Sequence, residues 1–194
     1  MMKKKYSCFA LFVFILTISS CHDVDYSPKP RGYFRIDFPQ KIYKLYDGGN
    51  CPFKFEYPVY STVDIDSERD AEPCWLNVQF WNLNGTLHLS YKDIKNNLYQ
   101  YTEDSRSLTD KHMVKATAID ETPVYNPENH VYGIKYDIEG NTASAVQFYV
   151  TDSVHHFLRG SLYFNLPPQI DSLEPVIRFV EADIDHLINT FSWK

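Results

Sequence analysis

The stretch that decides the fold is Trp75–Tyr91, which reads WLNVQFWNLNGTLHLSY. Polar and apolar residues alternate in its first part, so three apolar side chains share one face of an extended strand: Leu76, Val78 and Phe80. The pair Asn84-Gly85 is a strong hairpin signal, and the chain returns from Thr86 as a second strand. The stretch therefore predicts two antiparallel strands with one buried face.

Segments with the same alternation lie on both sides of this hairpin. Phe53–Tyr57 is the clearest of them, and Gly140-Asn141 marks a turn between two others. The remaining predicted strands are residues 33–38, 60–66, 115–123, 131–138, 143–151 and 155–164. Because turns rather than long crossovers separate most of these segments, we expect antiparallel pairing.

Helical spacing occurs in two regions of the chain. Ser90 can cap a helix that runs to about residue 103, and a second short helix is expected over residues 108–114. The last helix is expected to begin at Ser172, with Pro175 in its first turn. Its apolar stripe is Val176, Ile177, Val180, Ile184, Leu187, Ile188 and Phe191, and we place Glu174, Glu181, Asp183 and Asp185 on the other side.

The element order of strands, helix, strands and helix predicts an α+β fold in which helices pack on an antiparallel β-sheet. The layout resembles that of the PsbP/Mog1-like domains, which also open with a Phe-rich strand before Pro and close with a helix ending in Phe. Given a length of 194 residues, we expect residues 33–194 to form a single globular domain.

The first twenty residues have the features of a bacterial lipoprotein signal peptide. Lys3–Lys5 precede an apolar core that is too short to span a bilayer. The core ends in Ile18-Ser19-Ser20-Cys21, which resembles the lipobox: an aliphatic residue, two small residues and the lipid-carrying Cys. We expect residues 1–20 to be removed, Cys21 to carry the lipid anchor, and residues 21–32 to form a Pro-rich tether. The alternative is an ordinary secretory signal with an incidental cysteine.

Two cysteines remain in the expected domain, Cys51 and Cys74. In an oxidising compartment, a disulfide between them would close a loop of about 23 residues and stabilise the fold by about 3 kcal/mol. Two free buried thiols are the alternative. A metal site is disfavoured because no histidines at matching spacing accompany the pair, and we predict no bound metal.

The formal net charge of −6 argues against a nucleic-acid partner, because phosphates call for clustered Lys and Arg. Four residues near the membrane are predicted to contact a partner: Lys29, Arg31, Tyr33 and Arg35. In the alternative, Tyr33 belongs to the core and the charges face lipid headgroups.

A second basic group is Lys111 and His112, with Lys115 nearby. These side chains would either bind an anionic group or acidic partner surface, or solvate the end of a helix. Arg159 lies within an apolar run, so it either pairs with a buried carboxylate or marks a site.

Catalytic signals in the sequence are weak. Asp152, Ser153 and His156 are residue types found in hydrolases, but Ser153 lacks the Gly-x-Ser-x-Gly elbow, and we expect Asp152-Ser153 to form a turn. We therefore predict a protein that is not an enzyme. The alternative is a periplasmic ligand-binding or hydrolytic domain whose pocket lies near Asp152, His156, Arg159 and Lys111.

Several strings along the mature chain form a recognisable set: Tyr26–Ile36, Cys51–Phe53, Pro73–Asn77, Leu89–Lys92, Thr151–Ser153, His156–Phe164 and Thr190–Trp193. The set resembles the gliding-motility lipoprotein GldD family of Bacteroidota.

This resemblance implies a non-enzymatic membrane lipoprotein needed for gliding motility and the associated type IX secretion machinery. It also implies an envelope partner such as the membrane protein GldE. It favours the inner membrane, facing the periplasm, and the outer membrane is the alternative. No cofactor is implied apart from the covalent lipid on Cys21.

Overall fold

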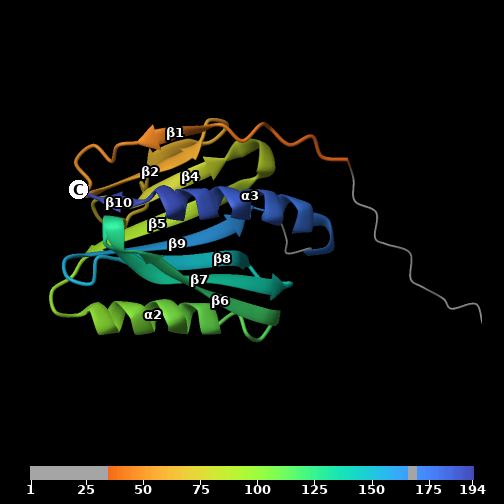
Figure 1. Ribbon diagram of the computed structural model, residues 1–194. Helices are drawn as coiled ribbons and strands as arrows, with labels where there is room; N and C mark the ends of the chain where they lie inside the picture. The colour runs from red at the N-terminus through yellow and green to blue at the C-terminus, as the bar shows by residue number, and fades with distance from the viewer. Residues whose placement is uncertain (1–34, 166–169) are drawn as a thin grey trace, which may run out of the picture. The chain divides into compact units, whose positions relative to one another are not determined.

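Two antiparallel sheets organise the residues that the computed structural model describes, which are 35–165 and 170–194 (Figure 1). The larger sheet has the strand order β3-β4-β5-β9-β8-β7-β6, and the smaller has the order β1-β2-β10. The larger sheet consists of β3 (Thr62–Ile65), β4 (Leu76–Phe80), β5 (Gly85–Asp93), β6 (Ala116–Asn126), β7 (Val131–Gly140), β8 (Ser144–Thr151) and β9 (His156–Phe164). The smaller consists of β1 (Tyr43–Tyr46), β2 (Phe53–Pro58) and β10 (Ser192–Trp193).

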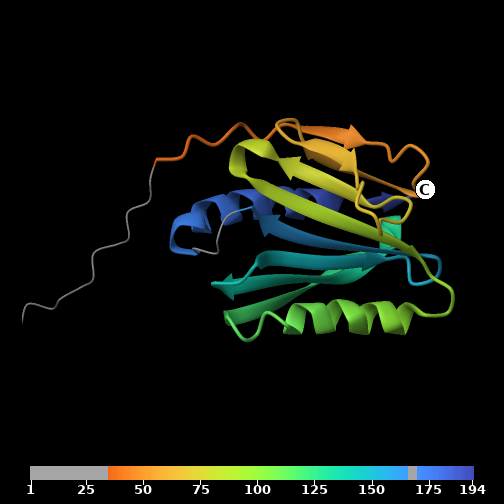
Figure 2. The same ribbon diagram turned by 180° about the vertical axis from the view of Figure 1, so that it is seen from behind.

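Two α-helices lie on opposite faces of the larger sheet: α2 (Leu98–Asp110) and α3 (Ile170–Thr190). In Figure 1, α3 crosses in front of β5 and β9, and in Figure 2 it lies behind them. α2 contacts β8 and β9 from the other side, where Tyr101 packs against Phe157. Two short 3₁₀ helices, η1 (Trp81–Leu83) and η2 (Pro127–Asn129), lie between strands.

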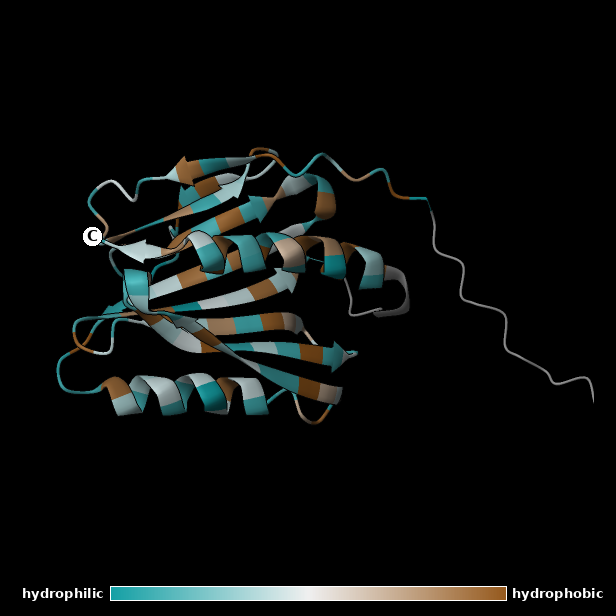
Figure 3. Cartoon of the chain, in the orientation of Figure 1, coloured by the Kyte–Doolittle hydropathy of each residue, from teal (hydrophilic) through white to brown (hydrophobic). Residues whose placement is uncertain are grey.

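The main core lies between the larger sheet and α3. Alternation along β4 and β5 buries every second side chain on this face, as predicted for Leu76, Val78 and Phe80. Hydrophobic and hydrophilic residues alternate along the strands in Figure 3. The stripe on α3 packs against this surface through buried residues such as Val180 and Ile184. Each such side chain stabilises the fold by about 1.5–3 kcal/mol.

The smaller sheet extends this core beyond the end of α3. Phe53 and Phe55 of β2 are fully buried and stack with Phe191, which directly follows the helix. Trp193 of β10 meets the edge of Phe53. The aromatic residues predicted to share one face of the strand at 53–57 therefore join the helix to the smaller sheet.

The α+β prediction is confirmed, and so are most of the strands. The predicted strand over residues 33–38 is wrong for its described part, because residues 35–42 form no strand. Phe38 instead stacks on Phe179 of α3, with ring centroids 4.3 Å apart. β1 was missed because it is a short edge strand whose residues are half-buried or exposed.

The predicted helix boundaries needed three corrections. Ser90 does not cap a helix, because β5 runs on to Asp93 and pairs Ser90 with Arg159 of β9. The two expected helices, one capped by Ser90 and running to about residue 103 and one over 108–114, are replaced by one helix, α2. α3 begins at Ile170, so Pro175 lies inside the helix rather than in its first turn.

Candidate partner-binding site

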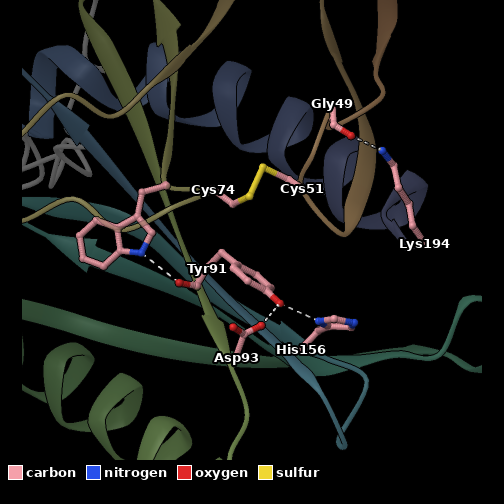
Figure 4. The surroundings of a disulfide bond; sticks show 8 residues. Gly49, Cys51, Cys74, Tyr91, Asp93, His156 and Lys194 are labelled. Atoms are coloured by element: carbon pink, nitrogen blue, oxygen red, sulfur yellow. Dashed lines mark hydrogen bonds between the residues drawn. A yellow bond between two sulfur atoms is a disulfide. The ribbon is translucent and has the colours of Figure 1, made fainter.

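A disulfide connects the smaller sheet with the larger one (Figure 4). Cys51 precedes β2, Cys74 precedes β4, and their Cα atoms lie 5.6 Å apart. The structure thus pairs the two cysteines that the sequence favoured as a disulfide. The covalent link holds β2 against the larger sheet independently of the aromatic packing between them.

Next to the disulfide, Tyr91 connects two polar side chains (Figure 4). Its hydroxyl donates to Asp93 Oδ1 at 2.6 Å, and His156 Nδ1 lies 2.7 Å from the same phenolic oxygen. Since a phenol has one hydrogen, the N–H on Nδ1 of His156 donates to Tyr91. Burial and then the hydrogen bond to Asp93 raise the pKa of Tyr91, so the group stays neutral and structural.

Asp152 stabilises the turn between β8 and β9 through its side chain. Its Oδ1 accepts the backbone N–H groups of Val154, His155 and His156 at distances of 2.8 to 2.9 Å. Burial alone would raise the pKa of Asp152, but these backbone hydrogen bonds lower it below its ordinary value. The turn that the sequence predicted at Asp152-Ser153 is therefore present, with Ser153 in the left-handed region at φ 69°.

The structure does not assemble the alternative pocket as one site. Asp152 and His156 line a shallow depression of about 460 Å³ with Trp193 and Lys194. Arg159 is three residues from His156 on β9, so its side chain projects from the opposite face of the sheet. The arrangement therefore does not support chemistry that needs Arg159 beside His156.

On this opposite face, Arg159 is a partly buried cation with a neutral partner. Its Nη2 donates to Gln147 Oε1 at 2.5 Å, and within the described residues no carboxylate forms an ion pair with it. Burial lowers the pKa of Arg159, and the neighbouring Tyr163 offsets this effect in part. Of the two predicted roles for Arg159, pairing with a buried carboxylate is not seen among the described residues, and the role of a site residue stays a prediction.

Two buried side chains beside Arg159 have unused hydrogen-bonding capacity. Gln147 is 1% exposed, and its Oε1 also accepts from Thr109 of α2 at 3.3 Å. In the part of the chain that the structure describes, neither Gln147 Nε2 nor Ser161 Oγ has a partner, although Ser161 is only 2% exposed. Buried polar groups are normally hydrogen-bonded, so this pair is unusual.

The basic residues at the end of α2 lie on the same side of the sheet. Lys111 follows the last turn of α2 and is exposed, and His112 is partly buried. Burial lowers the pKa of His112, and so does the positive charge of Arg159. Residues far apart in sequence thus converge, and we call Arg159, Gln147, Ser161 and His112 the Arg159 site.

The predicted membrane-side residues are described only in part. Arg35 is exposed, with 89% of its side chain accessible, and it pairs with Asp37 at 3.2 Å. Such exposed pairs contribute little to stability, so Arg35 is available for contacts. Cys21, Lys29, Arg31 and Tyr33 lie outside the described residues, as do residues 1–20 and the tether over 21–32.

Asp183 is a buried acid, contrary to the prediction from the sequence. We expected it on the outer side of the last helix, but it is 1% exposed. Its position three residues after Val180 and four before Leu187 is itself the signal, because this spacing puts it on the buried side.

The carboxylate of Asp183 accepts hydrogen bonds from three side chains. Lys41 Nζ and Tyr43 Oη donate to Oδ1 at 2.7 and 2.8 Å, and the hydroxyl of Tyr60 donates to Oδ2. Burial, followed by the hydrogen bond to Asp183, raises the pKa of Tyr43 to about 12. These hydrogen bonds attach the segments on both sides of β2 to α3.

A second ionic group joins α3 to β7. Lys135 is 7% exposed and donates to Glu181 at 2.9 Å and to Asp185 at 2.7 Å. Burial lowers the pKa of Lys135, but the hydrogen bonds to Asp185 and Glu181 outweigh it and raise the pKa overall. These two acids of α3 therefore hold the helix on the sheet.

Two further features are absent from the described residues. No group of three or more His, Cys, Asp or Glu side chains in that part of the chain is placed to hold a metal ion. None of its helices combines the length and apolar character needed to cross a membrane.

Together these features define a disulfide-bonded α+β domain with a helix on each face of its main sheet. The chain belongs to the family of the gliding motility lipoprotein GldD, whose model matches residues 23–193. This confirms the resemblance seen in the sequence.

One of the solved structures similar to this chain is a cyanobacterial protein. No curated protein matches the chain. Among solved structures, it is similar to the solution structure of cyanobacterial PsbP (CyanoP) from Synechocystis sp. PCC 6803, with 11% sequence identity and a TM-score of 0.48. The match covers 92% of this chain and 99% of that chain.

Proposed function

We propose that this chain is a lipid-anchored accessory or assembly component of gliding motility and of the associated type IX secretion machinery. It acts through protein–protein contacts and not by catalysis. Its anchor is the lipid on Cys21, in the inner membrane and facing the periplasm. Its partner is an envelope protein such as the membrane protein GldE.

The observation that carries this proposal is that Lys111, His112 and Arg159 lie on one side of the larger sheet, the side that α2 covers. The chain as a whole is acidic, with a formal net charge of −6, so a local basic group is a distinctive surface feature. Charge complementarity steers association and selects partners. A basic group of this kind fits an acidic surface on a partner protein.

The anchoring part of the proposal is tested by Cys21→Ser. Without the thiol no lipid is attached, so we expect the variant to move from the membrane fraction to the soluble fraction and to lose function. Each buried CH₂ of an acyl chain contributes about 0.8 kcal/mol, so loss of the chains should abolish anchoring. A variant that stays membrane-bound and works as before contradicts the proposal.

The partner is tested by crosslinking and pull-down of the tagged full-length protein from fractionated membranes. We expect GldE, or another inner-membrane protein, to be recovered with it. Deleting that partner should change the abundance or location of the chain. A chain that is monomeric, recovers no partner and is equally abundant without the candidate partner would refute the proposal.

A further inference from the structure

We infer that the Arg159 site binds a carboxylate group presented by a protein partner. The inference rests on the proposed function, because it names the chemistry of one contact in that complex. The carboxylate belongs to an Asp or Glu side chain, or to a chain end, of the partner.

The strand register brings the donors of the site together. Gln147 of β8 is the ladder partner of Ser161 of β9, so the two side chains are neighbours on one face. Arg159 is two residues before Ser161 and therefore points to the same face. His112 follows the end of α2, the helix that packs on β8 and β9 from this side of the sheet.

The guanidinium of Arg159 has a charge that no carboxylate of the described residues balances in an ion pair. An arginine cannot lose its proton in a protein, so the charge persists. A partly buried cation loses hydration, and the neutral amide of Gln147 returns only one hydrogen bond. An anion at this place would supply the missing counter-charge.

The unused donors indicate where the oxygens of that anion would lie. Gln147 Nε2 and Ser161 Oγ are buried and have no partner among the described residues. The remaining guanidinium N–H groups of Arg159 can donate to two acceptor oxygens, and the two buried groups would add to them once their side chains turn toward the anion. A carboxylate has two coplanar oxygens, and the planar guanidinium fork matches it in a bidentate pair.

The charge at the site favours a carboxylate over a phosphate. Arg159 contributes one full positive charge, whereas His112 is biased toward its neutral form by burial and by Arg159 itself. One negative charge balances this set, and a phosphate dianion would exceed it. Lys111 and Lys115 are exposed just after α2 and would guide an acidic segment toward this side of the sheet.

The first test measures thermal unfolding of the full-length lipoprotein in a non-ionic detergent. Sodium acetate is the carboxylate probe, sodium chloride at equal ionic strength is the reference, and sodium phosphate is the competing anion. We expect acetate at about ten times its dissociation constant to raise the Tm by about 3 °C over chloride. Arg159→Gln should lose this shift.

The matched control is Arg178→Gln, which removes an exposed arginine from α3 that pairs with Glu174 of the same helix. It should keep the full acetate shift. Equal shifts in the wild type and in Arg159→Gln would overturn the inference. A shift produced by phosphate but not by acetate would also overturn it, as would no shift with either anion.

Two further variants keep the test valid if Arg159→Gln fails to fold. Arg159→Lys keeps the charge but removes the planar fork, so it should lose most of the acetate shift. Ser161→Ala leaves the guanidinium in place and removes one donor, so it should reduce the shift. If both variants keep the wild-type shift, acetate does not bind at this site and the inference is wrong.

The second test compares recovery of the crosslinked partner by the wild type, Arg159→Gln and Arg178→Gln. We expect recovery to fall about tenfold only with Arg159→Gln, in line with loss of a buried charge-assisted contact. Equal recovery by all three proteins contradicts the inference and leaves the proposed function standing. If the wild type recovers no partner, the proposed function fails, and the acetate measurement then decides whether the site binds carboxylates.

Discussion

Lys41 Nζ lies 2.7 Å from Asp183 Oδ1, although 142 residues separate the two in sequence. The same ammonium group donates to the Phe179 carbonyl at 2.7 Å and lies 3.9 Å from the centroid of the Phe179 ring. Asp183 is fully buried, so this contact ties the segment before β1 to the interior of the fold.

Asp183→Ala should destabilise the domain by about 3 kcal/mol or more, because it leaves the hydroxyls of Tyr43 and Tyr60 and the Lys41 ammonium without their acceptor. Asp183→Asn should cost less, because it keeps an acceptor oxygen. Thermal unfolding of the full-length protein in detergent measures both. Asp104→Asn, on the exposed part of α2, is the control and should change the Tm by less than a degree or two.

The Cys51–Cys74 disulfide should contribute about 3 kcal/mol, since it closes a loop of 23 residues. A double variant, Cys51→Ala with Cys74→Ala, should fold but unfold at a lower temperature than the oxidised wild type. A reducing agent should lower the Tm of the wild type and leave the double variant unchanged. If reduction affected both proteins equally, the disulfide would not be the source of the stability.

Gly133→Ala should destabilise the pairing of β7 with β8. A Cβ at this position would lie 1.9 Å from the Tyr149 carbonyl oxygen, which belongs to the neighbouring strand and cannot move aside cheaply. We expect a loss of about 3 kcal/mol or more in the free energy of unfolding. Gly85→Ala is the comparison, because its Cβ would meet only the Phe164 ring at 3.0 Å. A smaller loss for Gly133→Ala than for Gly85→Ala would contradict the register of the two strands.

The stability of the domain should depend on pH through Asp137. Burial raises its pKa to about 6, the nearby Glu181 adds to the increase, and Lys135 opposes it. The folded state therefore holds this proton more tightly than the unfolded chain, whose pKa is near 3.8. The contribution that this proton makes to the free energy of unfolding is fully present below pH 3.8, and it is lost as the pH rises through 6.

Asp137→Asn should remove this dependence. Relative to the wild type, the variant should gain on the order of 1 kcal/mol in the free energy of unfolding between pH 4 and pH 7, after allowance for partial exposure. Lys135 keeps Glu181 and Asp185 as partners in the variant. Unfolding curves at a series of pH values measure the difference. If the difference in free energy of unfolding between the two proteins stayed constant with pH, the pKa of Asp137 in the folded state would be ordinary.

Much of the fold could be predicted because strands with one buried face have an alternating sequence. This pattern located β2, β4 and β9, and it assigned the buried residues of β4 correctly. The turn chemistry of Asn84-Gly85 fixed one hairpin, and Asn84 has the expected left-handed conformation at φ 53°.

The errors arose where tertiary pairing overrides local preference. Ser90 is a good helix cap in isolation, but the ladder with β9 continues past it. Residues 35–38 alternate, yet no neighbouring strand takes them up, and Phe38 packs on α3 instead.

The site itself could be predicted only residue by residue. The sequence singled out Lys111, His112 and Arg159, but their convergence depends on the β8–β9 register and on where α2 ends. Gln147 and Ser161 gave no signal at all, because a buried amide and hydroxyl look ordinary in a strand. Their importance lies in unused donors, which only the packed structure reveals.

The placement of the disulfide has a mechanical consequence. A load that reaches the domain along the chain ahead of residue 35 would first separate Phe38 and Lys41 from α3, and then unzip β1 from β2. Peeling would stop at Cys51, where a covalent bond passes the force to Cys74 and the main sheet. The domain can thus give way by one short hairpin under tension while its centre keeps its shape.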